Sequence, residues 1–218
     1  MKKRLIIALA LFVLLSTYKS KNLFTISKFN IKEIKIENNF ILKDKDIKKD
    51  LIFLYNKNLF FLNSNDIEKI LKKKSLVQSF EIKKIYPNKL KIKVFEKKPI
   101  AILQNKKNFF YISENIDLIN YFEFEEYKNL PIIFGDKKSF EVLYKNLKAI
   151  NFPVNLVKNY YLYESKRWDL VTYKKKIIKL PHKDYKNSLK NFMNLRDKSS
   201  FDKYDVFDYR ISNQLILQ

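Results

Sequence analysis

The sequence predicts an α+β protein with three parts. These are an N-terminal membrane anchor over residues 1–22, a small β-α-α-β-β domain over residues 29–98, and a mixed, mainly antiparallel β domain with packed helices over residues 99–218. An unbroken apolar run extends from Leu5 to Leu15. The spacing of apolar residues then changes repeatedly between Phe29 and Pro99, and short alternating segments recur in the remainder of the chain. With 46% apolar residues among 218, the chain can bury two separate cores.

The N-terminal run is typical of a membrane-targeting segment. Basic residues at positions 2–4 precede the run from Leu5 to Leu15, and Tyr18 supplies an aromatic side chain at its far end. The run is shorter than the roughly 20 residues that a spanning helix usually needs, so a cleaved signal peptide is the alternative. Small residues do not occur at the spacing that cleavage requires, which favours an uncleaved anchor with a cytoplasmic N-terminus. Lys19 and Lys21 weaken the charge asymmetry that sets this orientation.

The elements of the small domain follow in order. Alternation around Ile34 and Ile36 predicts a strand. Helical spacing of apolar residues predicts a helix over Asp44–Tyr55 and a second one from about Ser64. Alternating segments on either side of Pro87-Asn88 predict a hairpin with one buried face. The result is a three-stranded sheet with both helices on one side.

The second domain is predicted to contain strands and two amphipathic helices. Apolar residues at helical spacing place these helices over Phe140–Ile150 and Tyr185–Met193. The expected strands are 100–103, 109–112, 116–119, 130–134, 156–163, 168–173, 177–180 and a closing segment through Phe207, Tyr209 and Ile211.

Two local expectations concern the middle of this domain. Trp168 is predicted to pack in the core while Arg167 and Asp169 face outward. Lys174–Lys176 is interpreted as the solvated tip of a hairpin.

The net charge of +22 raises the possibility of nucleic-acid binding. Only four of the 45 basic residues are arginine, and the lysines are spread along the whole chain. Arginine is the residue that reads phosphate and guanine with two hydrogen bonds, so its scarcity argues against this class. The abundance of Lys, Asn, Ile, Phe and Tyr is better explained by the codon bias of an AT-rich genome.

The residues give little support for catalysis. The chain has one histidine, His182, one glycine and no cysteine, so neither a histidine or thiolate metal cluster nor a glycine-rich phosphate loop is expected. The carboxylates of Asp44 and Asp46 suit a helix start, and those over Glu123–Glu126 suit a solvated loop. The sequence therefore predicts a non-enzymatic protein without catalytic, cofactor-binding or metal-binding residues.

The closing segment predicts a strand with one buried face. Strands placed in sequence order would leave this last strand at the edge of the sheet, where unpaired backbone groups are either an aggregation hazard or a docking surface. We interpret it as a docking surface for a strand supplied by a partner.

Several quoted segments together resemble a known family. "NLFFLNSNDI" is followed by "YPNKLKIKVFEKKPIA" from Tyr86 to Ala101, "LPIIFG" from Leu130, "KRWDL" from Lys166 and "DYR" from Asp208. In this order, behind an apolar N-terminal segment, they resemble the FtsQ/DivIB family of bacterial cell-division proteins, with residues 29–98 as its POTRA domain. The chain departs from the family pattern at Asn38-Asn39 and at Glu114-Asn115, where glycine is common; Asn tolerates the left-handed backbone of such a turn.

The resemblance implies a role in the divisome. The expected protein is a single-pass scaffold of the inner membrane, anchored through Leu5, Leu15 and Tyr18. Its bulk is expected in the periplasm at the division septum, where it recruits and links early and late division proteins. The implied partners are single-span divisome proteins of the FtsB and FtsL type, captured by strand addition. The residues expected to bind them are Tyr209, Ile211, Ser212, Leu215 and Leu217, and no cofactor, nucleic acid or small-molecule substrate is implied.

Two other functions remain as alternatives. A POTRA-type protein that handles polypeptides in outer-membrane assembly or secretion would need tandem copies of the small domain or a long barrel sequence. A basic nucleic-acid binder would show affinity that falls steeply with salt and would carry no apolar N-terminal segment.

Overall fold

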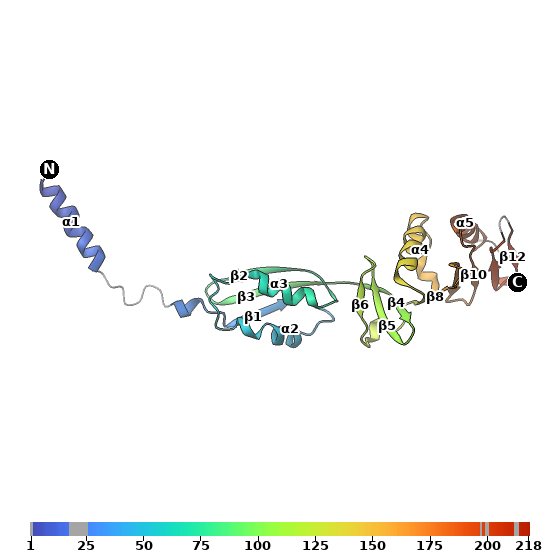
Figure 1. The fold of residues 1–218 in the computed structure, drawn as a ribbon, viewed down its shortest axis with the longest axis horizontal. Coiled ribbons are helices and arrows are strands. Elements are labelled where there is room, and N and C mark those ends of the chain that lie inside the picture. Colours follow the sequence, from blue (N-terminus) through green and yellow to red (C-terminus); the bar gives the residue numbers. More distant parts are fainter. Residues whose placement is uncertain (1, 18–25, 197, 199–200, 212–213) are drawn as a thin grey trace. The chain divides into compact units, whose positions relative to one another are not determined.

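A computed structural model describes residues 2–17, 26–196, 198, 201–211 and 214–218. The chain divides into two compact units, Met1–Phe95 and Glu96–Gln218, each with its own hydrophobic core (Figure 1). They are described separately below.

The apolar N-terminal run forms helix α1, Lys2–Thr17. Leu5 and Leu15 lie within it, whereas Tyr18 is outside the described residues. A helix of 16 residues rises about 24 Å, less than the roughly 30 Å of a bilayer's hydrocarbon core. Among the residues described, none of the helices combines the length and apolar character needed to cross a membrane.

The rest of the first unit has the β-α-α-β-β order that the sequence predicts. Its elements are a 3-10 turn η1 (Ile26–Phe29), β1 (Glu33–Glu37), α2 (Asp44–Asp50), a 3-10 turn η2 (Ile52–Leu54), α3 (Ser64–Lys73), β2 (Val77–Ile85) and β3 (Lys89–Glu96). The sheet order is β1-β3-β2, and β1 runs parallel to β3 with Ile34 opposite Leu90. Side chains of α2 and α3 pack on this sheet in a single core, which includes Ile47 and Ile67.

In this unit one helix is shorter than the sequence predicts, and one predicted turn is stabilised by its asparagine. The helix expected over Asp44–Tyr55 ends at Asp50 and continues as η2, which buries both Leu51 and Leu54 fully. Asn38 adopts a left-handed backbone with φ 61°, and its side-chain amide donates a hydrogen bond to the carbonyl of Val94 at 2.9 Å. Asn therefore supports this left-handed turn, as the sequence predicts.

The second unit contains a nine-stranded sheet in the order β12-β11-β10-β9-β8-β7-β4-β5-β6. The strands are β4 (Pro99–Asn105), β5 (Asn108–Ser113), β6 (Leu118–Asn120), β7 (Ile132–Phe134), β8 (Val157–Leu162), β9 (Trp168–Thr172), β10 (Ile177–Lys179), β11 (Val206–Asp208) and β12 (Ile216–Leu217). A short 3-10 turn η3 spans Glu125–Tyr127. Strand β7 pairs in parallel with both β4 and β8, and β10 with β11, so the sheet is mixed rather than a meander.

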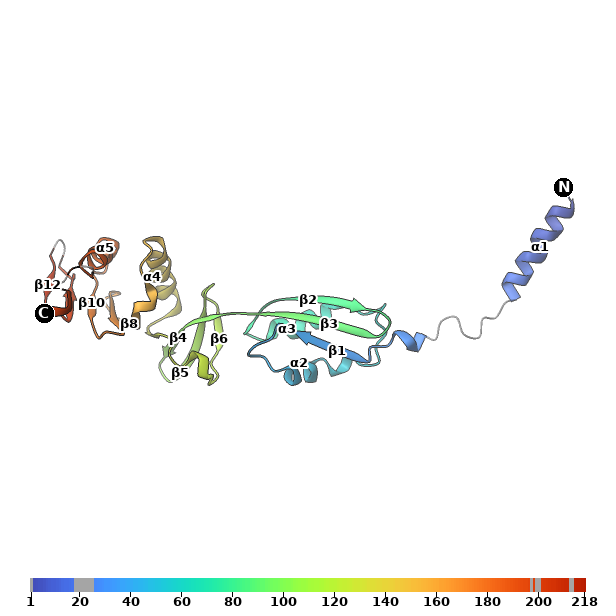
Figure 2. The same cartoon turned by 180° about the vertical axis from the view of Figure 1, so that it is seen from behind.

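Helices α4 (Lys137–Ala149) and α5 (Tyr185–Arg196) connect the parallel pairs β7–β8 and β10–β11. Right-handed crossovers between strands of the same direction place both helices on one face. They lie along the same side of the strands in Figure 1 and in the reverse view of Figure 2. Their buried side chains join one core with Ile133, Leu170 and Phe207, and we call the opposite surface the helix-free face.

The chain's single glycine has a packing role. A Cβ atom added to Gly135 would lie 2.9 Å from the Cβ of Leu162 and 3.2 Å from the Trp168 ring. Trp168 is buried, as the sequence predicts. Only glycine permits this close approach between β7 and its neighbours.

Two expectations for the second unit are wrong. Lys176 is buried rather than solvated, because its ammonium donates hydrogen bonds to the carbonyls of Asp202 and Tyr204 at 3.0 and 2.7 Å and pairs with Asp205. Asp169 is also buried, although it lies on the opposite face from Trp168, as strand alternation requires.

Candidate functional site

The sequence predicts that the strand through Phe207 lies at the edge of the sheet, and this expectation is wrong. β11 lies between β10, with which it is parallel, and β12, with which it is antiparallel. The chain turns back after Arg210 and pairs Leu217 with Phe207 and Ile216 with Asp208. Within the part of the chain that the structure describes, β12 is therefore the last strand at this end of the sheet.

Backbone hydrogen bonds define which side of β12 is unpaired. The N–H of Gln218 donates to the carbonyl of Val206 at 3.1 Å, and the N–H of Val206 donates to the carbonyl of Gln218 at 2.9 Å. Because successive residues of an antiparallel strand direct their backbone groups to opposite sides, the N–H and C=O of Leu217 point away from β11. Among the described residues, no strand lies on that outer side.

The five residues expected to bind a partner lie in different environments. Tyr209 is only 6% exposed, and its hydroxyl donates a hydrogen bond to Oδ1 of Asn191 on α5 at 2.9 Å. Burial raises the pKa of Tyr209. Leu215 and Leu217 are partly buried against the core, whereas Ile211 is 53% exposed. Ser212 lies outside the described residues.

A groove of about 640 Å³ runs beside these residues. It lies between α5 and the returning segment, and its lining includes Asn191, Leu195, Tyr209, Ile211 and Leu215. The structure therefore brings three of the five predicted residues to one surface, with Tyr209 as a wall of the groove rather than an exposed contact.

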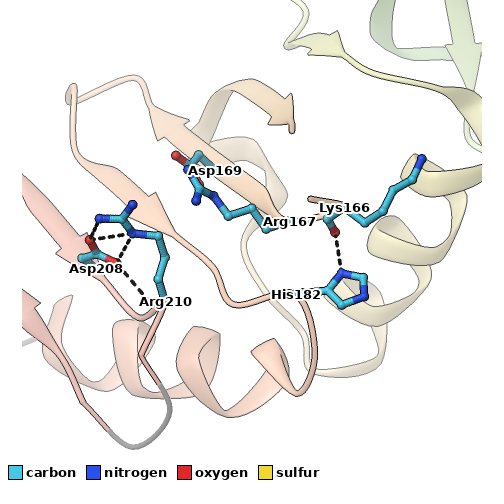
Figure 3. Close-up of polar contacts among 6 residues, drawn as sticks. All are labelled: Lys166, Arg167, Asp169, His182, Asp208 and Arg210. Carbon is cyan, nitrogen blue, oxygen red and sulfur yellow. Dashed lines mark hydrogen bonds and ion pairs between the residues drawn. The ribbon is translucent and has the colours of Figure 1, made fainter. Parts of the chain in front are cut away.

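Asp208 and Arg210 fix the point where the chain leaves β11. The Arg210 guanidinium donates to both carboxylate oxygens of Asp208 at 2.5–2.9 Å, and the backbone N–H of Arg210 donates to Oδ1 at 3.0 Å (Figure 3). These side-chain hydrogen bonds from Arg210 hold the pKa of Asp208 below its ordinary value and raise that of Arg210. The pair holds Ile211 at the start of the return toward β12.

The second buried carboxylate of the helix-free face is Asp169. Its Oδ1 lies 3.6 Å from Nε of Arg167, and neither atom has a hydrogen-bond partner (Figure 3). Burial raises the pKa of Asp169, and the charge of Arg167 opposes part of this effect. The Arg167 guanidinium stacks over the ring of Tyr163 at 4.5 Å.

Strand register brings the "KRWDL" and "DYR" segments together. Lys179 on β10 lies opposite Asp169 on one side and opposite Asp208 on the other. Lys179 is not among the residues that the sequence predicts for this site, although its alternation with the buried Ile178 places it on the same face as the two carboxylates. The arrangement is a lysine between two aspartates, each with its own arginine, next to β11 and β12.

Among the described residues, neither the chain's single histidine nor a cluster of metal-ligating side chains forms part of this arrangement. Nδ1 of His182 lies 3.1 Å from the backbone carbonyl of Lys166, and the histidine is exposed (Figure 3). No group of three or more metal-ligating side chains occurs among the residues that the structure describes.

Comparison with protein-family models matches both units. The model described as "POTRA domain, FtsQ-type" matches residues 29–97. The model described as "Cell division protein FtsQ/DivIB, C-terminal" matches residues 101–210. The second match ends at Arg210, immediately before the chain turns back toward β12.

Curated relatives carry the same names. The "Cell division protein FtsQ" of Rickettsia prowazekii (strain Madrid E) is 26% identical over 194 residues, which cover 87% of this chain and 72% of the relative. The protein of that name in Rickettsia felis (strain ATCC VR-1525 / URRWXCal2) is 26% identical over 231 residues, covering 100% of this chain and 86% of the relative. The "Cell division protein DivIB" of Clostridium botulinum (strain Loch Maree / Type A3) is 29% identical over 132 residues, covering 61% of this chain and 51% of the relative.

Proposed function

This chain belongs to the FtsQ/DivIB family of cell-division proteins, and we propose that it acts as a non-enzymatic scaffold that captures other division proteins at the septum by adding a partner strand to β12. The observation that carries this proposal is the outward-facing backbone of Leu217 at the end of the nine-stranded sheet. The alternative role in outer-membrane assembly or secretion is not favoured, because the residues after the POTRA domain match the FtsQ/DivIB C-terminal family.

Strand addition at β12 needs support from the surrounding surface. β12 is too short to hold a partner by its own ladder alone, so neighbouring side chains must contribute. Ile216 in β12 and Ile211 before it are exposed, and the groove along α5 lies next to them. The proposed partners are single-span division proteins of the FtsB and FtsL type, with Ile211, Ile216 and the backbone of Leu217 as contacts and Tyr209 and Leu215 as supports.

The proposed location is the inner membrane, with the bulk of the chain in the periplasm. Support comes from α1, in which three basic residues precede an apolar segment whose side chains are exposed wherever they are described. A helix with this pattern is stable in lipid, where its backbone groups are satisfied internally. Retention of the full chain in membranes after alkaline extraction, and its release when residues 2–17 are deleted, would support the anchor; release of the full chain would contradict it.

A matched pair of variants tests the strand-addition proposal. Leu217→Pro removes the outward N–H, while Leu217→Ala removes the same side chain but keeps the donor. Proline is compatible here because Gln218, not Leu217, donates to β11. In co-purification with tagged candidate partners, we expect Leu217→Pro to lose capture and Leu217→Ala to keep most of it. Equal capture by the two variants would show that the backbone edge does not bind the partner.

A further inference from the structure

Exposed aromatic side chains gather at one end of the POTRA domain. The ring of Phe60 stacks on Tyr86 at 4.7 Å and meets Phe29 edge-on at 4.6 Å. Next to it, Phe61 is 84% exposed, and Ile85 is also exposed. We refer to Phe60, Phe61, Ile85 and Tyr86 as the aromatic pole.

Backbone hydrogen bonds tie the aromatic pole to the segment through which the chain enters this domain. The N–H of Leu59 donates to the carbonyl of Phe29 at 2.8 Å, and the N–H of Lys32 donates to the carbonyl of Asn88 at 2.9 Å. The turn between β2 and β3 therefore lies beside η1, as both Figure 1 and Figure 2 show. The aromatic pole therefore lies where the chain enters the POTRA domain, and backbone hydrogen bonds join the three segments that form it.

The same segments are strongly basic. Residues 26–32, 56–63 and 84–89 contain five lysines and no aspartate or glutamate; one of the five, Lys89, pairs with Glu33 at 2.7 Å. The Lys84 ammonium donates hydrogen bonds to the carbonyls of Phe60 and Leu62 at 3.4 and 3.2 Å, which holds its charge at the base of the pole. Aromatic rings next to lysines suit the headgroup region of an anionic bilayer, where rings sit at the interface and cations face lipid phosphates.

The covalent distance to α1 is short. α1 ends at Thr17 and η1 begins at Ile26, so eight residues separate them. A chain extends by at most about 3.5 Å per residue, which limits the separation to about 30 Å. If α1 is held in a membrane, the aromatic pole is confined near that membrane's surface at a high effective concentration.

We propose that the aromatic pole docks on the headgroup region of the anionic bilayer that holds α1, and so fixes the orientation of the POTRA domain to the membrane. This inference depends on the membrane anchor in the proposed function. Each exposed ring would leave water on docking, and the lysines would add attraction that weakens with salt.

A spin-label experiment can test the docking because the chain has no cysteine. Single-cysteine variants Phe61→Cys and Phe40→Cys would carry the same nitroxide label in the full chain. Phe40 is a matched control because it is 83% exposed and belongs to the same domain. It follows the C-terminal end of β1, whereas the aromatic pole lies near the segment that precedes β1. Both proteins would be reconstituted in vesicles of phosphatidylethanolamine and phosphatidylglycerol and, in parallel, of phosphatidylcholine alone.

We expect the label at position 61 to lose access to a water-soluble nickel relaxation agent severalfold relative to position 40 in the anionic vesicles. The difference should shrink in phosphatidylcholine and at high salt. Equal access for both labels in protein that resists alkaline extraction would overturn the docking and leave the anchor standing. Protection at position 61 that appears only after a division protein is added would assign the pole to a protein partner and overturn the proposal. Extraction of the full chain by alkali would refute the anchor itself, and with it the tether on which the docking depends.

Discussion

The two end strands of the second sheet, β6 and β12, have different surroundings among the described residues. Near β6, aromatic side chains cover the helix-free face, whereas near β12 hydrogen bonds between charged side chains fix the end of β11. Tyr111 on β5 contacts the rings of Tyr121, Phe122 and Tyr127, and its hydroxyl donates a hydrogen bond to the carbonyl of Phe122 at 2.7 Å. At the other end, Asp208 and Arg210 pair beside a two-residue strand. Among the described residues β6 and β12 both end the sheet. The chain's own aromatic rings pack beside β6, whereas β12 has exposed Ile216 and a groove along α5 next to it, which suits contact with another chain.

The largest effect should come from removing the centre of the aromatic cover. Tyr111→Ala leaves a cavity beneath residues 121–127, and we expect a loss of about 3–5 kcal/mol in the free energy of unfolding. Chemical denaturation would measure it, with Tyr121→Ala, at an exposed ring of the same cluster, as a smaller control. If both variants lose the same small amount of stability, the aromatic cluster does not stabilise this end of the sheet.

A smaller loss is expected where polar ties hold the β12 end. Asp208→Ala removes the partner of Arg210, and we expect a loss of about 1–3 kcal/mol because these hydrogen bonds join charged groups. Asp202→Ala, at an exposed carboxylate in a neighbouring turn, should change stability little. Exchange of the Gln218 amide should also become faster in Asp208→Ala, since β12 depends on the turn that the pair fixes. An unchanged exchange rate of the Gln218 amide would show that β12 does not depend on the Asp208–Arg210 pair.

The two buried aspartates should respond oppositely to pH. The pKa of Asp208 is lowered in the folded state, so its stabilising effect is present above its unfolded pKa of about 3.9 and is lost as pH falls through the folded value. The pKa of Asp169 is raised by burial, so its ionisation costs stability as pH rises from about 3.9 through the folded value. Asp169→Asn should therefore be neutral or stabilising at neutral pH, by at most about 1 kcal/mol. Denaturation curves from pH 3 to 7 on Asp169→Asn and Asp208→Asn would check the signs. Equal losses of stability in the two variants at neutral pH would contradict them.

Much of the fold could be predicted because it depends on local patterns. Alternation around Ile34 and helical spacing around Ile67 and Leu143 place elements without any knowledge of their neighbours. The sequence did not reveal that β7 joins β4, because parallel pairing between distant segments leaves no local signal. The position of β11 has the same cause: periodicity predicts a strand through Phe207, but the pairing of Leu217 with Phe207 depends on a turn with no periodic signal.

The environments of the site residues were harder to predict than their positions. Alternation placed Asp169 on the face away from Trp168, yet the neighbouring Arg167 and Tyr163 that bury it depend on the preceding turn. Lys176 could not be distinguished from Lys174 and Lys175 by composition, because its burial depends on carbonyls 26 and 28 residues later. Register and long-range contacts, rather than periodicity, decide these cases.

Amide exchange at two adjacent residues tests the proposed docking edge most directly. In the free chain, the Gln218 amide is hydrogen-bonded to Val206 and the Leu217 amide points outward. Exchange of the Leu217 amide should therefore be fast in the free protein and strongly slowed when a captured division partner is bound, while that of Gln218 changes little. Slow exchange at Leu217 before binding, or no slowing in a complex that forms, would contradict a partner strand on β12.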